Sequence, residues 1–217
     1  MAKVNGLNVR LYVEGYDLSG DANAISAMGY TNELLDVTTL DVSAQKRLVG
    51  IVDSEVTVDA WFDNAASKQH AVWTSNSGKL PTADQDVLIP MGAAVADPCV
   101  GLVAKQGTYT TANAPGSAIT ATAAYSANGS AVEFGEMMTA HDDTHASAGS
   151  GTVVDSGAAS TNGGAGYLQV LSVASGSVTV NLQESTSSGG SYSNFMTFST
   201  VAAAAAPTSE RVTMSGN

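Results

Sequence analysis

The segment 53–62 has the most regular alternation of polar and apolar residues in the sequence. Its odd positions carry polar side chains: Asp53, Glu55, Thr57 and Asp59. Its even positions from 56 onward carry apolar ones: Val56, Val58, Ala60 and Phe62. Successive side chains of a β-strand point to opposite faces of its sheet, so this period of two predicts a strand with one wet face and one buried face.

Short runs of the same kind recur from Gly6 to about Ala140, separated by Gly, Asn, Asp or Pro. This pattern is typical of a mainly β protein, and it predicts strands over 8–18, 31–40, 86–90, 99–105, 118–126 and 131–138. The dipeptide Asn128-Gly129 separates the last two runs, and it is preferred in type I′ turns. We therefore expect those two strands to form a hairpin.

One segment interrupts the β pattern. Apolar and aromatic residues recur at three- and four-residue spacing through 65–75, directly after the capping pair Asp63-Asn64. This predicts a helix from Ala65 to about Ser75 that packs Trp73 on the sheet. His70 lies on the same helix, and we expect it at the surface or at the boundary of the core rather than as a general base.

The composition changes after His145 to Ser, Gly, Ala and Thr. The stretches 146–151 and 157–166 predict a linker or mobile loop. Four short β-type runs follow or adjoin it, at 167–173, 178–183, 195–201 and 211–214, with 202–206 as a loop between strands. We expect a β-domain over 1–145, and over 146–217 a Ser/Gly/Ala-rich linker with a small sandwich-like module whose core is small for independent folding.

The cluster most like a metal site is His-Asp-Asp-Thr-His at 141–145. Its two imidazoles would share a face, but the Glu of the zincin pattern is missing and a Gly/Ser-rich stretch follows, so we expect a solvated loop. The sequence has no Gly-x-Ser-x-Gly elbow, and 163–166 lacks the Lys-Ser/Thr of a phosphate loop. Cys99 is the only cysteine, which excludes an intrachain disulfide and favours an inert thiol. We predict a protein that is not an enzyme and needs no metal or other cofactor.

The charge balance excludes one class of function. The chain has 8 Lys+Arg against 20 Asp+Glu and a net charge of -12, and its cations are scattered. A protein that grips nucleic acid by neutralising phosphates needs the opposite balance. The N-terminus also lacks the apolar run of a signal peptide, and no later run is long enough to span a bilayer. We expect a soluble protein made in a cytoplasm, with no membrane partner.

Four segments, in this order, resemble the major tail (tail tube) proteins of long-tailed bacteriophages: Val9 to Gly20, Leu35 to Leu40, Lys46 to Gly50 and Val56 to Asp63. The resemblance is a general one over about 4–140. It implies a tail-tube-type β-sandwich or barrel, in a structural virion protein of the tail that is made in the host cytoplasm. Members of that family form hexameric rings that stack into a hollow tube, in which six sheets join into an inner β-barrel for genome ejection. The later segments 167–170, 178–183 and 195–198 resemble the β-rich C-terminal additions of phage tail proteins.

The resemblance also assigns roles to residues. It implies an acidic lumen that repels phosphate, so that DNA slides through without specific binding. We expect Asp53, Glu55 and Asp59 to face that lumen. The connection 41–52 would reach the neighbouring ring, where Lys46 and Arg47 would meet carboxylates; a flexible surface loop is the alternative. The partners would be further copies of the chain and other tail proteins.

A second class of function stays open from the sequence. It is a virion decoration or adhesion protein with a carbohydrate-binding β-module. Trp61, Trp73 and the scattered tyrosines form no evident cluster for stacking on sugars, so we rank it second.

Overall fold

A computed structural model describes residues 6, 8–155, 157, 161–187 and 190–215 of the chain. Over these residues the protein is mainly β, with one α-helix, which confirms the fold class predicted from the sequence. No helix in this described part is long and apolar enough to cross a membrane.

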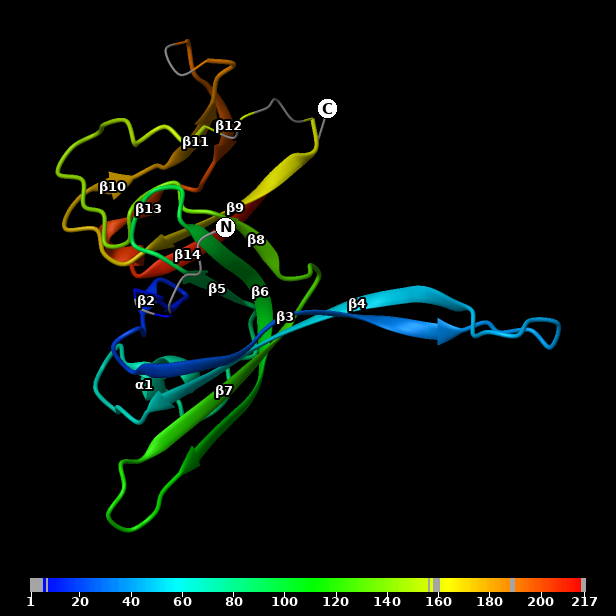
Figure 1. Ribbon diagram of the computed structural model, residues 1–217. Coiled ribbons are helices and arrows are strands. Elements are labelled where there is room, and N and C mark those ends of the chain that lie inside the picture. The colour runs from blue at the N-terminus through cyan, green and yellow to red at the C-terminus, as the bar shows by residue number, and fades with distance from the viewer. Residues whose placement is uncertain (1–5, 7, 156, 158–160, 188–189, 216–217) are drawn as a thin grey trace.

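Within the described residues, eight antiparallel strands form one large sheet in the order β2-β1-β5-β6-β7-β4-β3, with β8 paired to β6 (Figure 1). The strands are β1 (Tyr12–Val13), β2 (Tyr16–Asp17), β3 (Ala22–Asp36), β4 (Arg47–Trp61), β5 (Gln85–Pro90), β6 (Pro98–Ala112), β7 (Thr120–Ala127) and β8 (Glu133–Glu136). The core lies against one face of this sheet, and its largest fully buried side chains are Trp73, Tyr125, Leu11, Leu18, Ile89 and Leu102.

The strand β4 contains residues 53–61 of the predicted segment 53–62 and has the alternation that the sequence predicts. Val56, Val58 and Ala60 are buried, whereas Asp53 and Glu55 are exposed. The segment predicted as a strand over 31–40 is the end of the longer strand β3, which ends at Asp36. The alternation of polar and apolar residues thus decides which face of β4 is buried.

The prediction of one strand over 8–18 is wrong. The chain turns at Glu14 and Gly15, whose φ angles of 53° and 80° are both in the left-handed region, and the result is the short hairpin of β1 and β2. A Cβ at Gly15 would overlap the backbone of Thr208, so another segment packs closely on this turn. Tyr12 is consequently buried beside Val13 instead of facing water.

The predicted hairpin across Asn128-Gly129 is also wrong. Gly129 has a left-handed φ of 81°, as a turn requires, but β8 pairs with the first residues of β6 and not with β7. The reason is that β7 already pairs with β4 along one edge and with β6 along the other. The chain therefore crosses to the part of β6 that β7 leaves unpaired.

The helix α1 (Gln69–Trp73) is shorter than the predicted 65–75. Ser67 has a left-handed φ of 62°, which stops the helix from beginning earlier. Trp73 is fully buried, as predicted, and its ring meets that of Tyr109 edge-on at 5.9 Å between centroids. His70 lies at the boundary of the core, with its Nδ1 2.7 Å from the Tyr109 hydroxyl.

The C-terminal part consists of three two-stranded pairs in the described residues. They are β9 (Gly163–Val170) with β14 (Thr208–Ser215), β10 (Ser177–Val178) with β13 (Val201–Ala202), and β11 (Asn181–Glu184) with β12 (Ser193–Thr197). The expected loop over 202–206 contains a single 3₁₀ turn, η1 (Ala203–Ala205). The domain division at 145/146 stays a prediction.

The prediction of a linker over 157–166 is wrong for its last four residues, because Gly163 to Gly166 belong to β9. A Cβ at Gly166 would lie 3.0 Å from the Phe198 ring and 3.1 Å from the Met196 sulfur. A glycine at position 166 thus leaves room for the large side chains that pack closely on this strand. The other stretch, 146–151, contains no helix or strand, as expected of a linker.

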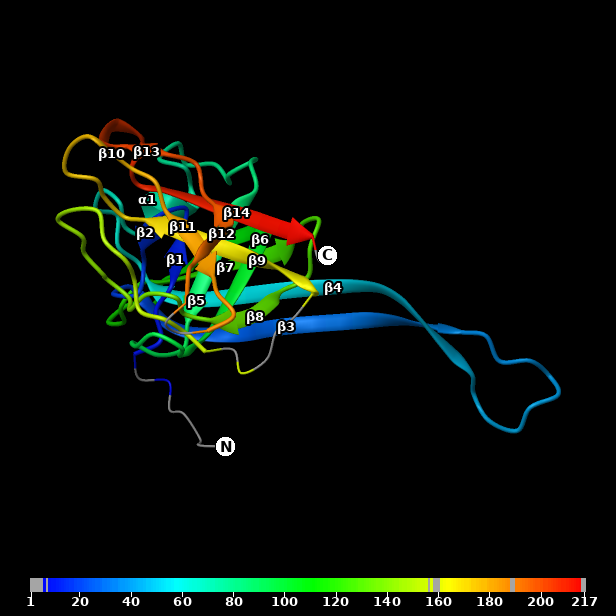
Figure 2. The same ribbon diagram turned by 90° about the horizontal axis from the view of Figure 1, so that it is seen from above.

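The strands β3 and β4 leave the body of the molecule as a long two-stranded hairpin (Figure 1). A second view shows the same hairpin extending to one side, while β9 and β14 lie beside β6 and β8 (Figure 2). The C-terminal strands contact the body through side chains of β5 and β8 and through the turn between β1 and β2.

Candidate functional site

The most prominent surface feature is the projecting hairpin, which we define as residues 31–53. The strand β4 pairs with β7 only from Glu55 to Trp61, so the earlier part of β4 has β3 as its single neighbour. About six paired residues on each strand give a projection of roughly 20 Å, to which the connecting loop adds. A two-stranded hairpin is marginally stable by itself in water, so this one is a candidate for contact with a partner.

Apolar side chains on the projecting hairpin are largely exposed. Leu34 is 57% exposed, Val49 68% and Ile51 79%, and Leu40 at the tip is fully exposed. Single exposed apolar residues are normal on a soluble protein, but a series of them along one element marks an interaction surface. The outer edge of β3 is also unpaired within the described residues, which leaves a row of backbone groups available to another strand.

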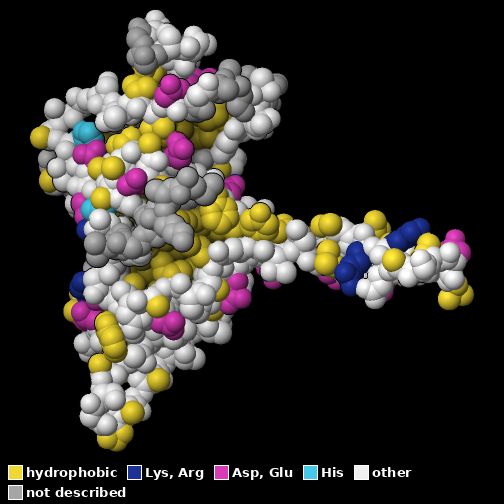
Figure 3. Space-filling view, viewed as in Figure 1, with side chains coloured by type: hydrophobic (Ala, Val, Ile, Leu, Met, Phe, Trp, Pro, Cys, Tyr) yellow, Lys and Arg dark blue, Asp and Glu magenta, His cyan; other side chains and the backbone are white. Residues whose placement is uncertain are grey.

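Some of these side chains continue the core face of the sheet outward. Tyr30 lies opposite Ser54, whose hydroxyl accepts a hydrogen bond inside the core. Leu34 lies four residues after Tyr30 in β3, and therefore on the same face of that strand. The Tyr30 ring meets the exposed Phe134 of β8 edge-on, with 6.5 Å between centroids. Hydrophobic side chains gather where the hairpin leaves the body, and more follow along it (Figure 3). This apolar surface therefore joins the body to the hairpin.

Lys46 and Arg47 lie toward the far end of the projecting hairpin. The Lys46 backbone N–H donates to Thr38 Oγ1 at 2.9 Å, and the Arg47 guanidinium donates to Gln45. Within the described residues, no carboxylate lies within 4.0 Å of either cation. The structure places Arg47 to Val52 in β4, so the connection predicted over 41–52 is a loop only as far as Lys46. The role of both cations between rings stays a prediction.

The three predicted lumen residues lie on the face of β4 that points away from the core. Asp53 and Glu55 are exposed, and Glu55 accepts a hydrogen bond of 3.0 Å from Thr57. Asp59 is half-buried and accepts a hydrogen bond of 2.6 Å from Thr122. The structure thus brings these carboxylates onto one face. Their orientation toward a lumen stays a prediction.

Small side chains lie beside these carboxylates, and Trp61, which is 50% exposed, lies at the end of the same face. In the sheet register, Ala124 lies beside Thr57, Ser126 beside Glu55, and Thr110 beyond Thr122. Lys105 shares the row of Ser126, but its charge is paired with Asp84 at 2.9 Å. The face is therefore flat, polar and negatively charged, with little that would hold an anion.

The segment 141–145 is a polar surface loop that contacts Arg10. The Arg10 guanidinium is paired with Asp142 at 3.1 Å, and His145 with Asp143 at 3.2 Å. No group of three His, Cys, Asp or Glu side chains among the described residues is arranged to hold a metal ion. Burial raises the pKa of the half-buried Cys99 thiol, with a smaller contribution from Glu136, so the nucleophilic thiolate is disfavoured.

One polar cluster was missed by the sequence analysis. An open hollow of about 430 Å³ lies between the large sheet and the C-terminal strands, and it is lined by Glu14, Asp84, Asp86, Val103, Ser209, Glu210 and Arg211. The two ends of the chain meet there, since Glu14 and Ser209 are 195 positions apart. No local pattern around either residue signals the contact.

No family model matches the sequence, and no curated protein matches it either. Several solved structures are similar. The tail of an empty gene transfer agent particle is 15% identical, with a TM-score of 0.45, over 62% of this chain and 99% of that chain. The sheath/tube terminator of an extracellular contractile injection system is 10% identical, with a TM-score of 0.49, over 62% and 98%. The tube-terminating cap of the anti-feeding prophage is 9% identical, with a TM-score of 0.48, over 63% and 93%.

The similar solved structures are components of tails and tubes.

Proposed function

We propose that this chain is a structural virion protein without catalytic activity, which forms hexameric rings that stack into a phage tail tube. The observation that carries the proposal is the projecting hairpin, whose apolar side chains are largely exposed and whose two cations form no ion pair in the described part of a single chain. The sequence resemblance over about 4–140 supplies the kind of assembly and the number of subunits. The partners are other copies of the chain and other proteins of the virion tail.

Association would remove the main liabilities of the isolated chain. Burying a Val, Leu or Ile side chain stabilises by about 1.5–3 kcal/mol, so covering Leu34, Val49 and Ile51 provides a substantial driving force. Pairing the free edge of β3 with a neighbouring chain would satisfy its backbone groups and prevent uncontrolled strand addition. An exposed ion pair contributes only about 0 to 1 kcal/mol, so Lys46 and Arg47 would add little to the strength of the contact between rings. Their role would be to set its register.

The flat polar face of β4 is our candidate for the wall of the lumen. Its carboxylates, Asp53, Glu55 and Asp59, are surrounded by Thr, Ala and Ser, and its one neighbouring cation, Lys105, is already paired. Carboxylates repeated around a ring would repel the phosphates of DNA. We infer a channel that lets DNA pass during ejection without binding it.

The proposal is tested by placing a charge on the projecting hairpin. In Val49→Asp the substitution lies on the hairpin, and in the matched control Val153→Asp it lies on a residue of similar exposure, 51%, in the segment after the large sheet. Sedimentation velocity of the purified full chain should show large assemblies for wild type and control, and monomers for Val49→Asp. Assembly of Val49→Asp to the same size as wild type, or a wild type that stays monomeric at high concentration, would reject the proposal.

A further inference from the structure

The paired strands β9 and β14, which we call the C-terminal ribbon, contact the large sheet through the Tyr167 ring, which packs on Gly101, and through polar side chains. Within the described residues the polar contacts form two groups. In the first, Gln169 Oε1 accepts a hydrogen bond of 2.6 Å from the Gly15 N–H, and Ser209 lies against two carboxyl groups. In the second, Arg211 and Tyr167 both bind Glu133. Interfaces of this polar kind between parts of a chain resemble transient ones.

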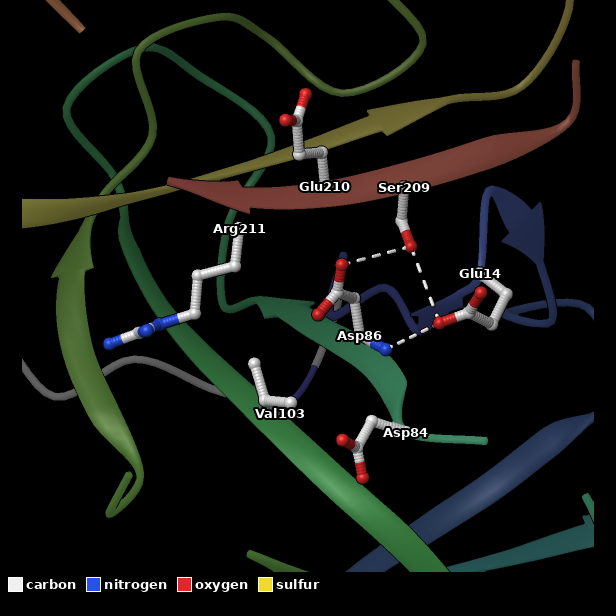
Figure 4. A pocket seen from close by; sticks show the side chains of 7 residues that line it. All are labelled: Glu14, Asp84, Asp86, Val103, Ser209, Glu210 and Arg211. Carbon is white, nitrogen blue, oxygen red and sulfur yellow. Dashed lines mark hydrogen bonds between the residues drawn. The ribbon is translucent and has the colours of Figure 1, made fainter. Parts of the chain in front are cut away.

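The first group is a cluster of two carboxyl groups around one hydroxyl (Figure 4). Ser209 Oγ lies 3.1 Å from Asp86 Oδ2 and 3.4 Å from Glu14 Oε1, and Glu14 Oε1 also accepts a bond of 2.6 Å from the Asp86 N–H. A hydroxyl has one hydrogen, so it donates a full hydrogen bond to only one of the two carboxylates. The second contact becomes a hydrogen bond when a carboxyl group carries a proton and donates it to Ser209 Oγ.

The charges around this cluster favour that proton. Asp84 precedes Asp86 in the chain, and Glu210 follows Ser209 on β14, so both add negative charge at the hollow. Figure 4 shows the Arg211 side chain pointing away from the carboxyl pair. Arg211 is paired with Glu133, and Lys105 on β6 is paired with Asp84. No cation in the described residues forms an ion pair with Glu14 or Asp86. Burial is the main reason why the pKa of the Tyr125 phenol on β7 is raised, and the nearby charge of Glu14 raises it further.

Burial is the main reason why the pKa of Glu14 and that of Asp86 are both raised. For Glu14, the hydrogen bonds from the Asp86 N–H and from Ser209 lower the pKa but do not cancel the effect of burial. For Asp86, the hydrogen bond from Ser209 and the charge of Arg211 act in the same lowering direction. The charge of Asp86 raises the pKa of Glu14 further, and the charges of Glu210 and Asp84 raise that of Asp86. Residues 209–211 of the ribbon form one side of the hollow that contains Glu14 and Asp86, so seating the ribbon adds to the burial that favours the protonated forms of this pair.

The second group has the opposite dependence on protons. Glu133 accepts hydrogen bonds of 3.0 Å and 2.5 Å from the Arg211 guanidinium and one of 2.6 Å from the Tyr167 hydroxyl. Burial opposes the ionisation of Glu133, but these donors together outweigh it and hold the pKa of Glu133 below its ordinary value. This group needs the ionised carboxylate.

We propose that the C-terminal ribbon is a pH-sensitive latch, which seats more firmly on the large sheet as the Glu14–Asp86–Ser209 cluster takes up a proton. This inference does not depend on the assembly proposed above. The gain begins as the pH falls through the raised pKa values of the pair and is complete below the ordinary values of 4.5 and 3.8. The contribution of Glu133 is full above 4.5 and is lost below that value. The ribbon is therefore seated more firmly at mildly acidic pH than at neutral pH.

Hydrogen exchange of the full chain tests this latch. The Gly15 N–H bonds across the contact to Gln169, so the peptide that contains it reports on seating. Exchange is followed from pH 7.5 to pH 5, corrected for the intrinsic rate, at a concentration where the chain is monomeric. The protection of the Gly15 N–H should rise as the pH falls. The rise should be about tenfold for each unit by which the pKa of a carboxyl group is higher when the ribbon is seated on the sheet than when it is lifted off. Constant protection in the wild type would overturn the proposal.

The variant E14Q/D86N removes both titrating groups, and the matched control D53N/E55Q makes the same two changes on the exposed face of β4. The rise in protection should disappear in the first and persist in the second. A rise that persists in E14Q/D86N, or that disappears in the control, would overturn the latch. The single variant E14Q is measured beside them and should show a smaller rise than wild type, which keeps the test decisive if the double variant does not fold.

Discussion

Gly101 of β6 lies directly beneath the ring of Tyr167 from β9. A Cβ at position 101 would overlap the Cε2 and Cδ2 atoms of that ring, so the C-terminal ribbon seats fully only because residue 101 has no side chain. This fit of a residue without a side chain under a large ring fixes where the ribbon crosses the sheet. It also makes the contact sensitive to a single methyl group.

We therefore expect Gly101→Ala to destabilise the chain by about 1–3 kcal/mol, the usual cost of forcing an extra methyl group into a packed contact. Gly29→Ala is the matched control, because a Cβ at Gly29 in β3 would meet no atom within 4 Å. Urea unfolding measures both. Equal stability of the two variants would show that Tyr167 does not need the space above residue 101.

The ion pair of Arg211 with Glu133 should matter more than a surface pair. The side chains of Arg211 and Glu133 are 21% and 33% exposed, whereas those of Lys105 and Asp84 are 47% and 46% exposed. Removing a hydrogen-bonded charge costs about 1.5–3 kcal/mol in the first setting, and an exposed pair contributes about 0–1 kcal/mol. Arg211→Met should thus lower the free energy of unfolding at pH 7 more than Lys105→Met does. A larger loss in Lys105→Met would contradict the structure.

The same pair predicts a dependence on pH. The pKa of Glu133 is lowered in the folded chain, so its contribution is present above the ordinary value of 4.5 and is lost as the pH falls below it. The difference in unfolding free energy between wild type and Arg211→Met should therefore shrink between pH 5 and pH 3. A difference that stays constant over this range would show that the pair contributes nothing through the ionised Glu133.

Stability and assembly should respond to different valines of the same strand. Val58 is buried in the core, and Val58→Ala should cost about 2 kcal/mol because two methyl-sized groups lose their burial. Val49 lies on the projecting hairpin, and Val49→Ala should change the unfolding of the monomer by less than about 0.5 kcal/mol. Sedimentation should show the reverse order, with assembly weakened more in Val49→Ala. Identical effects of the two variants in both assays would contradict the proposed division.

Reversing the cations of the projecting hairpin tests their proposed role in stacking. Lys46→Glu with Arg47→Glu should shorten or abolish tubes in electron micrographs while leaving rings, because like charges would face the neighbouring ring. Lys79→Glu reverses an exposed cation in the turns after α1 and should leave tube length unchanged. Tubes of normal length in the double variant would remove both cations from the stacking contact.

Local pattern was sufficient for the parts of the fold where one face is wet and the other buried. The alternation around Val56 and Val58 predicts the strand β4 and its buried face, and the spacing around Trp73 predicts the helix on the sheet. Where packing partners are distant in sequence, pattern was not sufficient. Position 15 has to be glycine because a Cβ there would overlap the backbone of Thr208 in β14, and Gly166 is in a strand because it pairs with Val212 of β14.

The same limit applies to the candidate site. The exposed face that carries Asp53 and Glu55 follows from the alternation of polar and apolar residues. The sequence of one subunit does not give the positions of other subunits, so it does not predict what this face contacts in an assembly. The cluster of Glu14, Asp86 and Ser209 needs residues from both ends of the chain, so it was found only once the strands were in place.

A cryo-electron microscopy reconstruction of the concentrated full-length protein tests the central claim most directly. We expect six-fold rings stacked into a tube, with Asp53, Glu55 and Asp59 on the wall of the bore. The projecting hairpin should contact a neighbouring copy. A reconstruction in which single chains remain separate, or in which lysines and arginines line the bore, would contradict it.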